Sequence, residues 1–210
     1  MRLPVYLEVG KGGATRAWVL ALPGVAASGR TPEAALAALP AVVAEEAARL
    51  GRLGRPWAHA GADLDFVETE RVQVDLDLGS GASTALFKHD LRPTRPEDVA
   101  AALERFDLAC REVEAAARAG AGDPGRLGVI ADSLLWLVSR LGSRPAHDLP
   151  AGGLDRFLAA ERIVVERLTH LLPGDIERHA VFAGEPWTTR KVLRRIALAV
   201  REEARAVTTH

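Results

Sequence analysis

The spacing of apolar residues changes near the middle of the chain, and this change limits the folds open to it. Before residue 80, apolar and polar residues alternate in short runs such as 3–9 and 72–78, a pattern typical of strands with one buried face. After residue 95, apolar residues recur every three or four positions, as they do along one face of a helix. The 210 residues therefore predict an α+β protein in which a sheet-forming part precedes a helical part.

The first part predicts a small antiparallel sheet packed on one helix. Thr31 precedes Pro32, and this pair is typical of a helix start; the helix should continue to about residue 50. Strands are expected at residues 3–9, 16–22, 25–28 and 72–78. This domain is assigned to residues 1–80, and residues 81–94 are expected to form a linker.

The second part, residues 95–210, predicts four amphipathic helices. Their apolar stripes lie at residues 99–117, 127–141, 154–172 and 192–207. Because the connections are of moderate length, we expect these helices to pack as an antiparallel four-helix bundle. Glu161 and Glu203 interrupt otherwise apolar stripes of the third and fourth helices. Each should either pair with an arginine such as Arg140 or Arg195, or line a wet cleft where its raised pKa would suit acid–base chemistry.

Charge and cysteine content exclude several classes of function. The 27 Lys and Arg nearly balance the 28 Asp and Glu, so neither half has the basic excess expected of a nucleic-acid-binding protein. Cys110 is the single cysteine, which excludes an internal disulfide framework and a multi-cysteine zinc site. No apolar run is long enough to cross a membrane, and the N-terminus does not resemble a signal peptide. We therefore expect a cytoplasmic protein that binds neither nucleic acid nor membranes.

The segment at residues 17–25, AWVLALPGV, together with TPEAAL at 31–36, resembles the HicB-like domain. In that family two strands lead to an LPG turn, a third strand and a helix. The resemblance covers roughly residues 3–78 and implies a three- or four-stranded sheet on one helix. Some HicB-like domains are antitoxins that mask a partner toxin, so a regulatory role is one alternative for this chain.

The segments IADSLLWLVSRL at residues 130–141 and EPWTTRKVLRR at 185–195 resemble the DinB/YfiT-like helical bundle. Such bundles often form homodimers and usually hold a divalent metal on three histidines, one on the second helix and an H-x-x-x-H pair on the fourth. The matching positions here are Val129, Ala199 and Glu203. Since valine and alanine cannot ligate a metal, the resemblance implies a bundle with a degenerate metal site, and we expect neither metal nor cofactor.

The six histidines contain no pair spaced three or four residues apart. A rebuilt site on the carboxylates of Asp132, Glu161 and Glu203 stays open as an alternative, because carboxylates bind hard cations.

In the DinB/YfiT-like family, one face of the second helix lines the metal cleft. By resemblance this face carries Val129, Ser133, Trp136 and Arg140, and the vacated cleft is a candidate ligand site. Trp136 would serve as core or as a ligand platform, and Arg140 as a forked donor to an anion or as a salt-bridge partner. The complete set of candidate cleft residues is Val129, Asp132, Ser133, Trp136, Arg140, Glu161, Ala199 and Glu203.

Two further interpretations concern residues outside this cleft. The basic residues of the fourth helix are interpreted as a solvated face, and Cys110 as a buried apolar residue. The basic residues are Arg190, Lys191, Arg194, Arg195, Arg201 and Arg205.

Three functions remain open. The favoured hypothesis is a binding or accessory protein that forms a homodimer and takes a small-molecule ligand in the bundle cleft. A pairing of a HicB-like domain with a DinB-like bundle resembles bacterial proteins of unassigned function. The first alternative is a DinB-superfamily enzyme, either a thiol S-transferase or a metal-free activity. The second is the HicB-like regulatory role.

Overall fold

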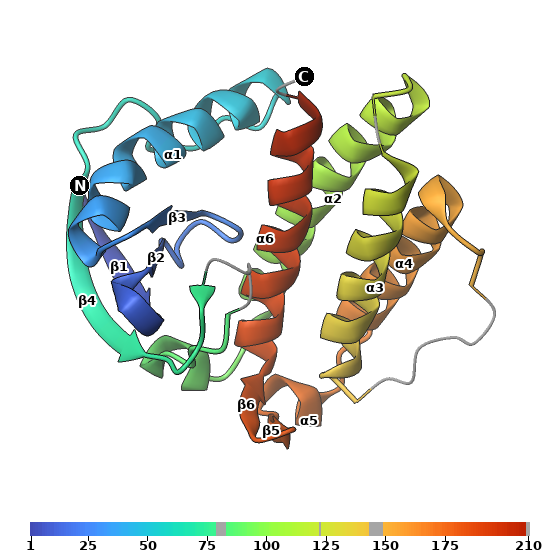
Figure 1. Ribbon diagram of the computed structural model, residues 1–210. Coiled ribbons are helices and arrows are strands. Elements are labelled where there is room, and N and C mark those ends of the chain that lie inside the picture. Colours follow the sequence, from blue (N-terminus) through green and yellow to red (C-terminus); the bar gives the residue numbers. More distant parts are fainter. Residues whose placement is uncertain (79–82, 122, 143–148, 209–210) are drawn as a thin grey trace. The chain divides into compact units, whose positions relative to one another are not determined.

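The computed structural model describes residues 1–78, 83–121, 123–142 and 149–208 (Figure 1). The protein has a mixed α+β fold and divides into two compact units, Met1–His89 and Asp90–His210. Within these described residues, the first unit holds a sheet and one long helix, and the second holds four long helices, one short helix and a two-stranded hairpin.

The first unit contains a four-stranded sheet with the strand order β3-β2-β1-β4. Its strands are β1 (Arg2–Val9), β2 (Thr15–Trp18), β3 (Ala26–Gly29) and β4 (Asp65–Gln73). The pairs β1–β2 and β2–β3 are antiparallel, whereas β1 and β4 run parallel. The prediction of an antiparallel sheet is therefore wrong for β4. The long helix between β3 and β4 provides the crossover that parallel strands require.

The last strand of this sheet also lies earlier than the alternation predicted. Val74 and Leu78 are buried, as the alternating pattern at 72–78 required, but the regular strand ends at Gln73. The polar stretch before it forms the strand because it pairs along one side of β1. Such an edge strand needs only a few apolar residues, and periodicity alone therefore placed it too late.

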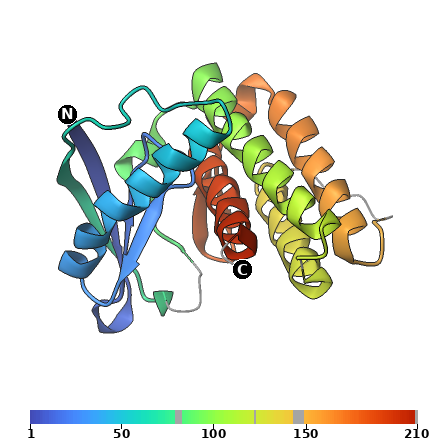
Figure 2. The same ribbon diagram turned by 90° about the horizontal axis from the view of Figure 1, so that it is seen from above.

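The core of the first unit lies between the sheet and α1 (Pro32–Arg52), which lies along one sheet face (Figure 2). The side chains of Leu3, Val5 and Leu7 alternate toward this face, where they pack with Leu39 and Val43 of α1. As predicted, α1 begins after Thr31, whose hydroxyl oxygen accepts a hydrogen bond from the Ala34 amide at 3.2 Å.

The other face of the sheet binds the segment 83–89 through Glu8. This carboxylate is fully buried and accepts hydrogen bonds from the Ser83 hydroxyl at 2.6 Å and from the Thr84 and Ala85 amides at 2.8 and 2.9 Å. Phe87 is buried against Tyr6, with ring centroids 5.4 Å apart. The expected linker 81–94 therefore includes residues that pack within the first unit, while 81 and 82 lie outside the described residues.

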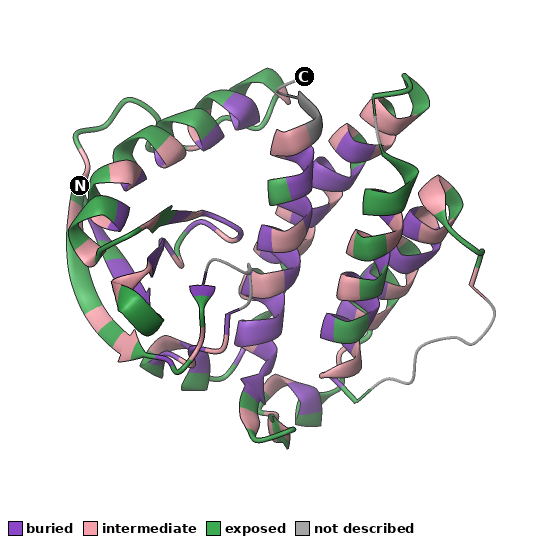
Figure 3. Cartoon of the chain, in the orientation of Figure 1, coloured by how far each residue is buried: buried purple, intermediate pink, exposed green. Residues whose placement is uncertain are grey.

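The second unit is built on α2 (Pro96–Arg118), α3 (Pro124–Ser139), α4 (Gly153–Thr169) and α6 (Thr189–Thr208). These four helices lie where the apolar stripes predicted them. They enclose one core, in which α2 packs mainly on α6 and α3 mainly on α4. On α3 and α4, buried residues follow one side and exposed residues the other (Figure 3). Cys110 is fully buried in this core, as predicted.

The connection between α4 and α6 contains structure that the sequence did not predict. A short helix, α5 (Pro173–Ile176), precedes the antiparallel strands β5 (His179–Phe182) and β6 (Glu185–Thr188). Ala183 and Gly184 form the two-residue turn, both with positive φ angles of 52° and 81°. Alanine is an uncommon first residue for such a turn, and the hairpin signal was therefore weak.

Candidate functional site

Aromatic and cationic side chains from α3, β5, β6 and α6 meet in the second unit and form what we call the cation–aromatic cluster. The rings of Trp136 and Trp187 lie edge to face, with centroids 5.2 Å apart and planes at 82°. Trp187 is buried, with 1% of its surface exposed, whereas Trp136 is 42% exposed. The cluster thus has a buried aromatic floor and one accessible ring. Its members are Trp136, Arg140, Phe182, Trp187, Lys191 and Arg195.

Arg140 lies at the centre of this cluster. Its guanidinium carbon is 4.2 Å from the ring centroid of Trp136 and 4.8 Å from that of Phe182. Stacking on two rings orients the planar guanidinium group, whose edge carries its hydrogen-bond donors. The Nε atom is buried, yet it donates to no group in the part of the chain that the structure describes. Such an unsatisfied buried donor costs about 1–3 kcal/mol, more for a charged group.

The other two cations of the cluster differ from each other in their surroundings. The ammonium group of Lys191 is fully buried and donates to the Glu185 carboxylate at 2.7 Å and to the Pro186 carbonyl at 2.9 Å. Burial lowers the pKa of Lys191, and Glu185 opposes that shift. Arg195 lies with its guanidinium carbon 5.5 Å from the Trp187 ring centroid. The cluster thus holds three cationic side chains, and Glu185 pairs with one of them.

Trp187 contributes a second unsatisfied donor. Its indole Nε1 is buried and has no hydrogen-bond partner among the described residues. Buried indole N–H groups usually find an acceptor. The cluster therefore combines two orphaned donors, cationic side chains and a partly exposed aromatic ring, a combination that suits an anion with an apolar body.

The candidate residues in the middle of α3 do not join this cluster. Val129 is 67% exposed, and the Ser133 hydroxyl donates to the Val129 carbonyl at 3.0 Å. Asp132 instead forms an ion pair with Arg156 of α4 at 2.6 Å. The structure thus brings together only Trp136 and Arg140 from the α3 candidates.

The two carboxylates that interrupt apolar stripes also lie apart. Glu203 is buried and forms an ion pair with Arg126 at 2.8 Å. Of the two alternatives left open for Glu203, pairing with an arginine therefore applies, but with a partner other than Arg140 or Arg195. Arg126 lies on the exposed first turns of α3. The apolar pattern did not indicate this arginine as a partner for Glu203. Ala199, one turn earlier on α6, is half-buried.

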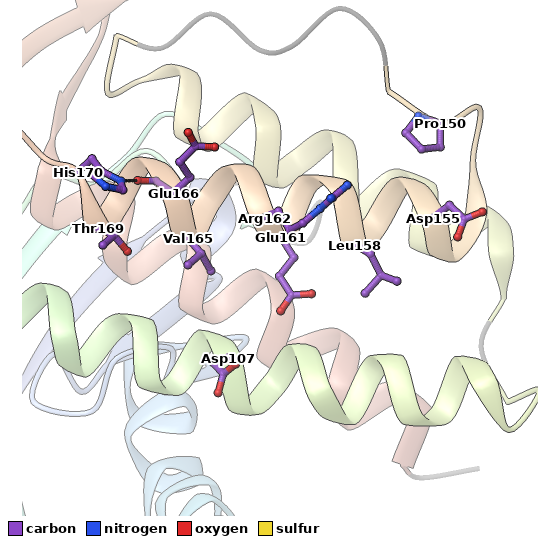
Figure 4. Close-up of a pocket in the computed structure, with 10 residues that line it drawn as sticks. All are labelled: Asp107, Pro150, Asp155, Leu158, Glu161, Arg162, Val165, Glu166, Thr169 and His170. Atoms are coloured by element: carbon purple, nitrogen blue, oxygen red, sulfur yellow. Dashed lines mark hydrogen bonds between the residues drawn. The ribbon is translucent and has the colours of Figure 1, made fainter.

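Glu161 lies in an open groove between α2 and α4, where its side chain extends toward α2 (Figure 4). Burial raises its pKa, with smaller contributions from the like charges of Glu114 and Asp107, while Arg111 lowers it. Glu161 thus lines an open groove, and acid–base chemistry at this carboxylate stays a prediction. Within the described residues, no group of three or more His, Cys, Asp or Glu side chains could hold a metal ion.

The interpretation of the basic residues of α6 as a solvated face is wrong for three of them. Lys191, Arg194 and Arg201 are buried. Arg194 forms an ion pair with the buried carboxylate of Asp90 at 2.9 Å. Lysine and arginine side chains on one helix face are usually exposed to solvent. The sequence did not indicate the carboxylates and rings that contact them here.

Four members of the cluster were not among the candidate cleft residues: Phe182, Trp187, Lys191 and Arg195. Trp187 could have been selected from the sequence, because it lies in the EPW segment on which the suggested family resemblance rests. No sequence pattern pointed to Phe182, since its contact with Arg140 depends on the unpredicted hairpin.

In the described residues, no helix is long and apolar enough to cross a membrane. The chain matches no protein-family model, no curated protein and no solved structure.

Proposed function

We propose that this chain is a cytoplasmic binding or accessory protein, with a HicB-like first unit and a DinB/YfiT-like second unit that holds no metal. In this proposal the cation–aromatic cluster binds a small organic carboxylate, and two copies of the chain form a homodimer. The observation that carries the ligand proposal is Arg140, whose guanidinium group is stacked on aromatic rings and keeps a buried, unsatisfied donor.

The chemistry of the cluster favours a carboxylate. A guanidinium edge presents two parallel donors that match the two oxygens of a carboxylate. Because Trp136 and Phe182 already hold Arg140 in place, little side-chain entropy remains to be lost on binding. The exposed part of Trp136 offers an apolar surface to the body of the ligand.

Benzoate is a suitable probe, with benzyl alcohol as its uncharged analogue and inorganic phosphate as a second anion. We expect benzoate to raise the melting temperature and to bind in calorimetric titration, and Arg140→Gln to weaken that binding at least about tenfold. The matched control is Arg162→Gln on α4, which should bind benzoate as the wild type does. Equal binding of benzyl alcohol, or unchanged binding by Arg140→Gln, would overturn the proposal. Preference for phosphate would replace carboxylate with phosphate as the ligand class.

Metal analysis of the purified protein separates this proposal from the thiol S-transferase alternative. That chemistry needs a cation to lower the pKa of the thiol. About one tightly bound transition metal ion per chain would favour the enzyme, and sedimentation equilibrium would test the homodimer.

A further inference from the structure

The groove between α2 and α4 is a second surface of the helical unit, separate from the cation–aromatic cluster. It is open and has a volume of about 1030 Å³. Most of its lining comes from one side of α4, and Asp107 contributes from α2 (Figure 4). From Leu158 to Thr169 the lining covers roughly 16 Å of the helix axis, which is three turns.

The floor of this groove is apolar. Leu158 packs partly against the core, and Val165, two turns further along α4, is 37% exposed. In Figure 4 both side chains extend from α4 toward α2. Leu158 and Val165 lie seven residues apart and so on the same side of α4, and the turn between them carries Glu161 and Arg162. This apolar strip of two side chains matches the spacing of apolar side chains on a second helix laid beside it.

The rim of the groove is acidic. Four carboxylates line it, those of Asp107, Asp155, Glu161 and Glu166. Beside them lie the basic side chain of Arg162 and the titratable side chain of His170. Arg111 pairs with Asp107 at 2.8 Å, with both side chains well exposed. Asp155, Glu161 and Glu166 form no ion pair with any residue that the structure describes. The carboxylates therefore outnumber the cations along the apolar strip.

We propose that this groove docks a basic amphipathic helix of a partner protein. An apolar strip flanked by carboxylates complements a helix that carries apolar residues on one side and lysine or arginine beside them. A small cation would leave Leu158 and Val165 uncovered, and a nucleic acid would be repelled by the carboxylates. The charge of the groove thus selects a basic partner, and the apolar strip selects a helical one.

A labelled synthetic peptide of three to four turns, with leucines on one face and lysines beside them, provides the test with the full-length chain. We expect fluorescence anisotropy to detect binding that weakens with salt. A peptide with glutamates in place of the lysines, and one of the same composition without an amphipathic face, should each bind at least about tenfold more weakly.

Glu161→Lys and Val165→Glu should each weaken binding of the lysine peptide by about tenfold, whereas Glu202→Lys, an exposed acid on α6, should change it less than about twofold. Glu161→Lys removes one of several neighbouring carboxylates, and a melting temperature near that of the wild type checks that the variant folds. Equal loss in Glu202→Lys, or no loss in either groove variant, would overturn the proposal. A sedimentation profile that shows self-association abolished by Glu161→Lys would identify a second copy of the chain as the occupant instead.

Discussion

In the second unit, the neighbours of a charged residue decide whether it forms an ion pair and in which direction its pKa shifts. Glu161 and Glu203 look alike in the sequence, since each interrupts an apolar stripe. Glu203 gains a partner in Arg126, whereas Glu161 faces other carboxylates. A buried carboxylate with a partner is tolerated, and one without a partner holds its proton more tightly.

The raised pKa of Glu161 leads to a prediction about stability. The folded state keeps the Glu161 carboxyl protonated at higher pH than the unfolded state does. The contribution of this carboxyl to the free energy of unfolding is therefore fully present at low pH and is lost as the pH rises through the raised pKa. Glu161→Gln should therefore raise the free energy of unfolding at pH 7 by up to about 0.5 kcal/mol. Urea unfolding at pH 7 and pH 4 measures this, and the gain should shrink at pH 4. A gain of equal size at both pH values would contradict the explanation.

At the scale of elements, two short segments matter as much as the long helices. The hairpin of β5 and β6 supplies Phe182 and Trp187 to the cation–aromatic cluster. In the first unit, the segment 83–89 is bound to the sheet by the buried carboxylate of Glu8. Neither segment has the periodicity by which helices and strands are predicted, because each is held by specific contacts with residues distant in the sequence.

Removing the Glu8 carboxylate should release the segment 83–89. Glu8→Ala removes the carboxylate that accepts from the Thr84 and Ala85 amides, and each lost bond of this kind to a charged acceptor costs about 1.5–3 kcal/mol. We expect the free energy of unfolding to fall by about 3 kcal/mol and these two amides to exchange hydrogen faster. Glu70→Ala is the matched control, because Glu70 binds the Lys88 amide at an exposed position. Unchanged exchange at both amides would disprove the role of Glu8.

At the scale of the whole molecule, the chain joins two units with separate cores, and our functional proposal concerns metal-independent binding. Under the proposed DinB/YfiT-like resemblance, Val129 and Ala199 stand at two of the three positions where that family has its histidines. The proposal predicts that EDTA leaves the melting temperature and the benzoate affinity unchanged. A fall in melting temperature that added zinc or nickel reverses would show that another ligand set holds a metal.

The sequence by itself determined the α+β class, the change from strands to helices, and the positions of α1, α2, α3, α4 and α6. These features follow from local periodicity and from helix starts such as Thr31–Pro32, which act within a few residues. Only the tertiary structure decided that β4 pairs parallel to β1, that Glu203 pairs with Arg126, and that Arg140 stacks on Trp136 and Phe182. Those contacts join residues far apart in the chain, and their energies depend on burial and orientation, which arise when the elements pack together.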